Sequence, residues 1–247
     1  MRSLALTQFL ELAGTPARQL SGGHKGFRRF VLNYFEHGVW AKLLVFRGLT
    51  GVGKTHYLHR LAEQGYPVVD LEGLANHRGS AFGNLGLPPQ PNQKMFESLL
   101  WDELRKVPHD GYILAEGESR HIGRIALPAR VYQALQVEKS IWLNASLEAR
   151  VRNILADYPA VDQLKEEFTK PIRALKDKLG NETMNRFLLL LEDGNWSELV
   201  SELMVNYYDP LYRHTLPERR IEVELEPEET VMERIEAAVA EVLGQSS

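Results

Sequence analysis

Apolar and polar positions alternate along the chain in blocks that predict strands and helices in turn. An apolar run at residues 43–46 is followed by a glycine-rich turn, a helix with its apolar side chains on one side, a stop at Gly65 and a second strand ending near Asp70. We predict further strands at 112–116, 140–145 and 219–226, and further helices at 95–107, 146–158 and 228–243. This alternation is typical of an α/β protein with a mostly parallel sheet, helices on both faces and ligands at the carboxyl ends of the strands.

Two segments depart from this alternation. Residues 161–206 have a helical pattern that is interrupted near Gly180 and Asp193, so we expect a helical insertion over about residues 146–216 of the α/β domain at 41–247. The segment "GGHKGFRRFVLNYF" stands before the first strand and has the pattern of a basic amphipathic helix. We therefore expect residues 1–40 to form a basic N-terminal extension.

The composition is that of an ordinary soluble globular protein, and it excludes several kinds of chemistry. The 247 residues are 44% hydrophobic and 25% charged, and none of them is a cysteine. Disulfides, thiolate metal sites and thiol catalysis are therefore excluded. No apolar run reaches the roughly 18 residues that span a bilayer, so we expect a cytoplasmic protein with no membrane partner.

The formal net charge of -4 conceals an uneven distribution. Residues 18–60 carry eight Lys or Arg and one acid, whereas residues 182–241 carry fifteen acids and five basic residues. A polyanion is expected to meet the first region, around Arg18, Lys25, Arg28 and Arg29, because the local field steers a charged partner. The alternative is a basic face that is simply solvated.

The segment "GLTGVGKT" satisfies the phosphate-binding pattern G-x-x-x-x-G-K-[ST] between a predicted strand and a predicted helix. In such a loop the backbone N–H groups converge on phosphate oxygens, Lys54 reaches the outer phosphates and the Thr55 hydroxyl is a ligand for Mg²⁺. The expected ligand is a di- or triphosphate, with ATP or GTP among the possibilities, and the expected fold is that of a P-loop NTPase. The predicted phosphate-binding residues of the loop are Gly48, Leu49, Thr50, Gly51, Val52, Gly53, Lys54 and Thr55.

Two pairs of acids follow predicted strands. Glu116 and Glu118 end the strand at 112–116, where this fold commonly keeps the acid that holds water around Mg²⁺, and we take Glu116 as the metal-side residue. The alternative is that one of them caps a turn or pairs with Arg120. Asp70 and Glu72 follow the second strand and are candidates for binding a nucleophile or serving as a base, with ordinary loop acids as the alternative.

Several arginines lie near strand ends and are candidates to neutralise a leaving phosphate. Arg150 and Arg152 resemble the lid arginines of nucleotide kinases, although two arginines on a helix are also common as surface charges. The full set is Arg78, Arg120, Arg124, Arg150 and Arg152.

Two further polar groups are candidates for ligand contacts. In the loop "VVDLEGLANHRGSAFG", Asn76, His77 and Arg78 are suited to phosphate or base contacts, although a lone loop histidine is usually structural. The tyrosines of "NYYDPLYRH" either stack on bases or line an apolar pocket, or they pack in the ordinary way. These tyrosines are Tyr207, Tyr208 and Tyr212.

Taken together, these segments resemble one family. Five segments of this chain resemble, in order and spacing, the P-loop half of tRNA 2-selenouridine synthase. They are "GLTGVGKT", "VVDLEGLANHRGSAFG", "QPNQKMFESLL", "EGESRHIGRIALP" and "YYDPLY", and they cover about residues 43–212. The segment "GGHKGFRRFVLNYF" resembles the end of the rhodanese-like domain that precedes the P-loop half in that family. The rest of that domain has no counterpart here.

The resemblance implies a specific reaction on tRNA. In that family, wobble 2-thiouridine is converted to 2-selenouridine, with selenophosphate as selenium donor and an S-geranyl intermediate made from geranyl diphosphate. It implies that the P-loop binds geranyl diphosphate with Mg²⁺ and that Asn76, His77, Arg78, Arg28 and Arg29 face phosphate or tRNA. The implied catalytic residues are Lys54, Asp70, Glu72, Glu116, Glu118 and Arg120.

The chain also departs from the family pattern. The family's rhodanese-like domain carries selenium on a cysteine, and this chain has no cysteine, so we expect either a separate rhodanese-like partner or only part of the reaction. The segment "EGESR" stands where an acid-rich "EDESR" is expected, which leaves the choice of metal-side acid open. The alternatives are a small-molecule or nucleotide kinase of the P-loop class, and a non-catalytic module that binds tRNA or a partner.

Overall fold

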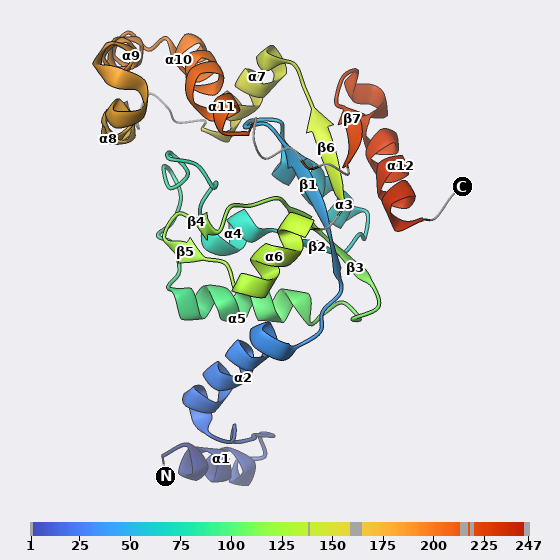
Figure 1. Cartoon of the computed structure of the whole chain (residues 1–247). Coiled ribbons are helices and arrows are strands. Elements are labelled where there is room, and N and C mark those ends of the chain that lie inside the picture. The colour runs from blue at the N-terminus through green and yellow to red at the C-terminus, as the bar shows by residue number, and fades with distance from the viewer. Residues whose placement is uncertain (1, 138, 159–164, 213–216, 218–219, 245–247) are drawn as a thin grey trace.

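The computed structural model describes residues 2–137, 139–158, 165–212, 217 and 220–244, and a five-stranded sheet lies at its centre (Figure 1). Every pair of neighbouring strands in this sheet is parallel. The strand order is β2 (Val68–Val69), β3 (Tyr112–Glu116), β1 (Lys42–Gly48), β6 (Ser140–Asn144) and β7 (Arg220–Glu224). The predicted α/β fold with a mostly parallel sheet is therefore confirmed.

Helices cover both faces of the sheet, as predicted. Successive strand residues point to opposite faces, so Val45 of β1 joins one core cluster and Phe46 joins the other. The face of Val45 is covered by α2 (Gly23–His37), α4 (Leu71–Ala75), α5 (Gln93–Leu104) and α6 (Ala129–Val137). The face of Phe46 is covered by α3 (Lys54–Glu63) and by α12 (Val231–Leu243), which follows the short 3-10 turn η2 (Glu228–Thr230).

A layer of helices with its own core lies beyond the carboxyl ends of the strands. Figure 1 shows these helices at the end of the molecule opposite to α1 (Arg2–Leu12) and α2. Gly180 has a φ of 83°, so α9 is broken at the predicted place, and α9 ends next to Asp193. The layer consists of α7 (Leu147–Asp157), α8 (Lys165–Ala174), α9 (Lys176–Glu192), α10 (Trp196–Leu203), the π-helix η1 (Met204–Tyr208) and α11 (Asp209–Tyr212). The predicted insertion at 146–216 also includes residues 159–164 and 213–216, which lie outside the described residues, and the domain boundaries stay a prediction.

The predicted amphipathic helix before the first strand is α2. Its apolar side chains Val31 and Phe35 are buried in the same cluster as Val45. Phe27 and Phe30 meet Trp101 of α5 edge-on, with ring centroids 5.5 and 5.4 Å apart. The helix is thus packed against the sheet domain.

One small sheet was not predicted. The strands β4 (His121–Ile122) and β5 (Ile125–Ala126) pair in antiparallel fashion directly after β3. Two-residue strands are too short to give an alternating apolar pattern, so the sequence alone gave no sign of them. Within the described part of the chain, no helix has both the length and the apolar character needed to cross a membrane.

Candidate functional site

The P-loop occupies the turn between β1 and α3, which is the strand–turn–helix context that its motif requires. Gly51 and Gly53 have φ values of 78° and 88°, a region that favours glycine. A Cβ atom at Gly51 would lie 2.7 Å from the Met204 methyl carbon and 2.8 Å from the Arg150 carbonyl oxygen. Lys54 begins α3, and its ammonium group lies 3.4 Å from the Gly48 carbonyl oxygen, so its side chain folds back over the loop.

Three glutamates converge next to Thr55. Glu116 ends β3 and is completely buried. Its carboxylate accepts one hydrogen bond from the Thr55 hydroxyl at 2.9 Å and one from the Glu72 backbone N–H at 2.9 Å. A carboxylate oxygen of Glu72 lies 3.4 Å from the Thr55 hydroxyl, and the side chains of Glu72 and Glu118 share a hydrogen bond. The acids of β3 and of the loop after β2 therefore form one cluster beside the P-loop, as their positions at strand ends led us to expect.

Burial governs the charge of this cluster. Loss of hydration, together with repulsion between neighbouring carboxylates, raises the pKa of Glu72 and of Glu116 to about 8 and that of Glu118 to about 7. The Lys54 ammonium lowers the pKa of Glu72 and Glu118. Near neutral pH the cluster therefore retains protons that a bound cation could displace.

The residues around Thr55 fit a magnesium ion that is shared with a ligand. Mg²⁺ is usually held by one or two protein groups, several waters and substrate phosphates. The Thr55 hydroxyl and the Glu116 carboxylate supply such groups at the end of the P-loop. Among the described residues, no three His, Asp or Glu side chains are arranged to hold a metal ion on their own. Phosphate oxygens would have to complete the coordination, and this metal site stays a prediction.

Asp70 has a structural position that differs from the predicted catalytic one. One carboxylate oxygen caps α4 by accepting a hydrogen bond from the Gly73 N–H at 2.7 Å. The other lies 2.8 Å from the His59 imidazole nitrogen of α3. Both oxygens of Asp70 are thus engaged in joining α3 to α4, and His59 was not identified from the sequence.

Arg150 has a structural position that differs from the prediction that it binds phosphate, and for Arg152 phosphate binding stays a prediction. Arg150 is 4% exposed, and its guanidinium donates to the Thr50 carbonyl oxygen at 2.9 Å and to both carboxylate oxygens of Asp209. It fastens the back of the P-loop to α11. Asn153 of α7 makes a second contact with the P-loop by donating a hydrogen bond to the Gly51 carbonyl oxygen at 2.9 Å. Arg152 is exposed on α7.

The loop after α4 uses its polar side chains to hold itself in place, which differs from the predicted contacts with phosphate or RNA. Asn76 donates to the Pro89 carbonyl oxygen at 3.2 Å. Arg78 donates to the carbonyl oxygens of Leu85 at 2.9 Å and Asp157 at 3.0 Å, and it lies over the Tyr158 ring. His77 is 7% exposed, and burial lowers the pKa of its imidazole, so the ring is neutral near pH 7. This loop therefore joins the sheet to the helical layer.

The remaining predicted arginines fall into two groups. Arg28 forms a short ion pair with Glu97 of α5, while Arg29 on the same helix is exposed, and the contact of both with tRNA stays a prediction. Arg120 and Arg124 are exposed on the segment that contains β4 and β5. Arg120 is thus not part of the buried glutamate cluster, although it follows Glu118 closely in sequence.

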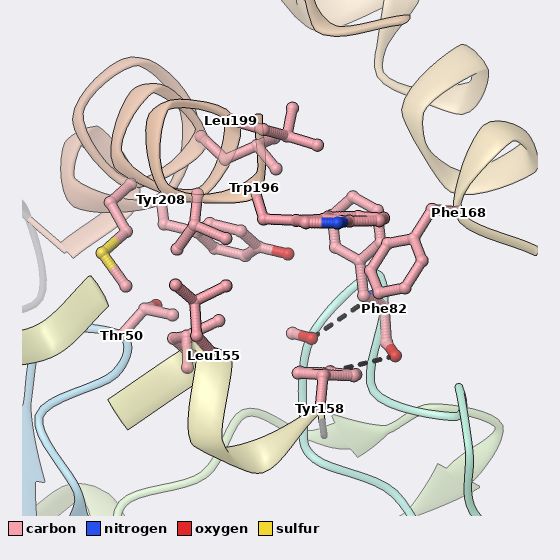
Figure 2. Close-up of a pocket in the computed structure, with 13 residues that line it drawn as sticks. Thr50, Phe82, Leu155, Tyr158, Phe168, Trp196, Leu199 and Tyr208 are labelled. Carbon is pink, nitrogen blue, oxygen red and sulfur yellow. Dashed lines mark hydrogen bonds between the residues drawn. The ribbon is translucent and has the colours of Figure 1, made fainter. Parts of the chain in front are cut away.

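An apolar pocket opens on the other side of the P-loop, at Thr50 (Figure 2). Figure 2 shows the rings of Phe82, Phe168 and Trp196 gathered at one end of the pocket and Thr50 and Leu155 at the other. Of the three predicted tyrosines, only Tyr208 lines it, because Tyr207 lies against Lys178. The lining residues are Thr50, Ser80, Phe82, Ile154, Leu155, Tyr158, Phe168, Trp196, Leu199, Val200, Leu203, Met204 and Tyr208.

Most residues of this pocket could not be recognised from the sequence. Its walls come from the P-loop, the loop after α4 and four elements of the helical layer. Each of these segments shows only the ordinary apolar pattern of a packed helix or loop. The one local signal was the aromatic sequence around Tyr208.

Comparisons with known proteins agree with the residues described above. Residues 41–242 match a family model described as the tRNA 2-selenouridine synthase AAA domain. The tRNA 2-selenouridine synthase of Nitrosomonas europaea is 31% identical over 89% of this chain and 68% of that protein. The protein of the same name from Bdellovibrio bacteriovorus is 33% identical over 90% of this chain and 68% of that protein.

A solved gluconokinase structure from Sinorhizobium meliloti is also similar to the chain. The similarity covers 83% of this chain and 94% of the gluconokinase, with 12% sequence identity and a TM-score of 0.38. At this TM-score the likeness carries no argument about function.

Proposed function

Because the chain belongs to the tRNA 2-selenouridine synthase family, we propose that it is the P-loop part of a tRNA-modifying enzyme. In this proposal it binds geranyl diphosphate and transfers the geranyl group to the sulfur of wobble 2-thiouridine in tRNA. Selenation is assigned to a separate rhodanese-like protein, because this chain has no cysteine to carry selenium.

The observation that carries the proposal is the apolar pocket next to the P-loop. Thr50 of the P-loop lines this pocket, so in this proposal the organic part of a diphosphate held by the loop lies in the pocket. The pocket walls are almost entirely aliphatic and aromatic, as an isoprenoid chain requires, and they offer few polar partners for a purine base and ribose. This favours an isoprenoid diphosphate over a nucleoside triphosphate.

The proposed transfer breaks one bond and forms another. The C–O bond between the geranyl C1 carbon and the diphosphate breaks, and its electron pair leaves with the diphosphate. A lone pair of the thiouridine sulfur forms the new C–S bond, and the uracil ring loses its N3 proton. The backbone N–H groups of the P-loop and the Lys54 ammonium stabilise the negative charge that develops on the departing diphosphate.

The glutamate cluster has two tasks in this proposal. Glu116 orients the Thr55 hydroxyl through the hydrogen bond at 2.9 Å, and a magnesium ion held there would add positive charge next to the leaving group. Glu118 is less buried than Glu116 and is not engaged by Thr55, and its pKa of about 7 suits a proton acceptor at neutral pH. We assign it as the acceptor of the N3 proton.

The test compares three ligands and then looks for product. Calorimetric titration should show tighter binding of geranyl diphosphate than of inorganic diphosphate, and weaker binding of ATP. Incubation with thiolated tRNA and geranyl diphosphate, followed by mass spectrometry of the nucleosides, should reveal S-geranyl-2-thiouridine. Equal affinity for the first two ligands together with ATP turnover would instead indicate a kinase, and binding without product would indicate a non-catalytic module.

Adding selenophosphate to the same reaction tests whether selenation requires a separate rhodanese-like protein. The chain alone should yield the geranylated nucleoside and no 2-selenouridine. Appearance of 2-selenouridine without another protein would overturn the assignment of selenation to a separate partner.

A further inference from the structure

A small basic hairpin stands beside the glutamate cluster. It consists of β4, β5 and the residues around them, at 119–127, and it starts directly after Glu118. Ile122 and Ile125 point into the core, whereas the side chains of Arg120, His121 and Arg124 are exposed. Residues 119–137 contain no acid at all, so the hairpin presents positive charge next to an acid-rich site.

Two glutamines hold the hairpin in the way that a neighbouring strand would. The Gln90 side-chain amide donates to the Ile122 carbonyl oxygen at 2.9 Å and accepts from the Arg124 backbone N–H at 2.9 Å. Gln93 donates to the Ala126 carbonyl oxygen at 2.7 Å and accepts from the N–H of the same residue at 2.9 Å. A two-stranded hairpin is only marginally stable in isolation, so these four bonds give it a fixed position.

The tip of the hairpin is fixed as well. Gly123 has a φ of 58°, and a Cβ atom there would lie 2.7 Å from the imidazole ring of His77. The tip therefore packs directly on the buried His77 of the loop after α4. The arginines on either side of Gly123 project from a rigid support.

The arginines of the hairpin differ from the other predicted arginines in what they contact. Arg28, Arg78 and Arg150 are all engaged by acids or carbonyl oxygens of the protein. The Arg120 backbone carbonyl accepts a hydrogen bond from the Leu127 N–H, but its guanidinium makes no hydrogen bond or ion pair with the part of the chain that the structure describes. Arg124 uses one nitrogen to bond the Gln90 carbonyl oxygen and is otherwise exposed. A pair of exposed guanidinium groups at fixed positions is suited to bind phosphate groups.

We propose that the β4–β5 hairpin binds the phosphate backbone of tRNA beside the nucleotide that is modified. This inference rests on the proposed function, because it takes the polyanion to be the tRNA substrate. Arg120 lies two residues after Glu118, so phosphates held by Arg120 and Arg124 would bring the neighbouring base to the P-loop and the glutamates. Phosphate contacts position a nucleic acid without reading its sequence. Thiolated and unthiolated tRNA should therefore bind the hairpin equally well.

The decisive experiment measures tRNA affinity across a series of salt concentrations for the double variant Arg120→Gln/Arg124→Gln. We expect affinity to fall about tenfold or more near physiological salt, and the slope of log K against log salt to decrease by roughly one to two units, since two phosphate contacts are lost. The conservative variant Arg120→Lys/Arg124→Lys should keep most of the salt slope. The control Lys170→Gln/Arg173→Gln removes two exposed charges from α8 and should change neither value.

Two further measurements separate the possible outcomes. The variant Lys25→Gln/Arg29→Gln tests the competing basic surface on α2, and an effect there with none at the hairpin would overturn the proposal. Geranyl diphosphate titration of the hairpin variant should match that of the unchanged chain. If no form of the chain binds geranyl diphosphate but the hairpin variant still loses tRNA, the proposed transfer reaction fails while the tRNA surface stands.

Discussion

The two sides of the P-loop differ sharply in chemistry. On the side of β3, Thr55 meets a cluster of buried glutamates that retain protons near neutral pH. On the side of α7 and α10, Thr50 opens onto a pocket of aliphatic and aromatic side chains. The loop itself is suited to hold a diphosphate and is the same for many ligands. In the proposed function, the apolar pocket therefore selects the organic group attached to the diphosphate, and the glutamate cluster determines the reaction.

The largest effect is expected on the glutamate side. Glu116→Gln keeps the shape of the side chain but removes the carboxyl group that could lose its proton to a bound magnesium ion, so the rate of geranyl transfer should fall by about 100-fold. The free energy of unfolding should not decrease, because the substitution also removes a carboxyl that is costly to bury. Single-turnover assays at several Mg²⁺ concentrations measure the rate, and a rate within threefold of the unchanged chain would exclude Glu116 from the reaction.

Lys54→Ala tests the loop that both walls share. Removing a charge-assisted contact with the outer phosphate should weaken binding of geranyl diphosphate and of inorganic diphosphate alike, by roughly 1 to 3 kcal/mol, with the fold intact. Calorimetric titration with each ligand gives the two values. Lys176→Ala, an exposed lysine at the start of α9, is the matched control. Unchanged affinity in a folded Lys54→Ala chain would remove this residue from the site.

A substitution in the apolar wall should separate the two ligands. Leu155→Asn places an amide of similar size among the hydrocarbon side chains of the pocket, so geranyl diphosphate should bind about 1 to 2 kcal/mol more weakly. Inorganic diphosphate should bind as before. Leu189→Asn changes a leucine of α9 that is 60% exposed and lies outside the pocket, and it should affect neither ligand. Equal losses for both ligands would mean that the pocket does not hold the geranyl chain.

The smallest effect concerns stability and pH. Burial raises the pKa of Glu118 to about 7, so the folded chain keeps a proton that the unfolded chain loses near pH 4.5. The free energy of unfolding should therefore decrease as the pH rises from about 5 to 7. Solvent reaches this half-buried side chain, so the contribution is on the order of 1 kcal/mol. Urea denaturation of the ligand-free chain at several pH values measures it. Glu118→Gln should reduce the slope between pH 5 and 7 and leave the part that Glu72 and Glu116 contribute, and an unchanged slope would show that the pKa of Glu118 is not raised.

The fold could be predicted from the sequence because its signals are local. The strand at residues 43–46, the glycine-rich turn and the helix after it each have a pattern that is visible within about ten residues. Glu116 could be placed near the P-loop because it ends a predicted strand, where this fold commonly keeps the acid that holds water around Mg²⁺. The family resemblance added the expected reaction.

The rest of the site depends on residues that are far apart in sequence. Arg150 looked like a lid arginine because nothing near it shows that its partner is Asp209, 59 positions further along. Asp70 looked catalytic because its contact with His59 joins two different elements. The pocket brings Thr50 together with Trp196 and Tyr208, and no local pattern marks residues that meet only after the helical layer folds over the loop.

The contact between Arg150 and the P-loop has a thermodynamic consequence. Its guanidinium joins the Thr50 carbonyl oxygen to Asp209, at the start of α11. Thr50 also lines the pocket, and Met204 lines the pocket while limiting the space at Gly51. A hydrocarbon that displaces the helices would therefore also displace the phosphate-binding backbone. We expect the two halves of the ligand to bind with a coupling free energy, so that each raises the affinity of the site for the other.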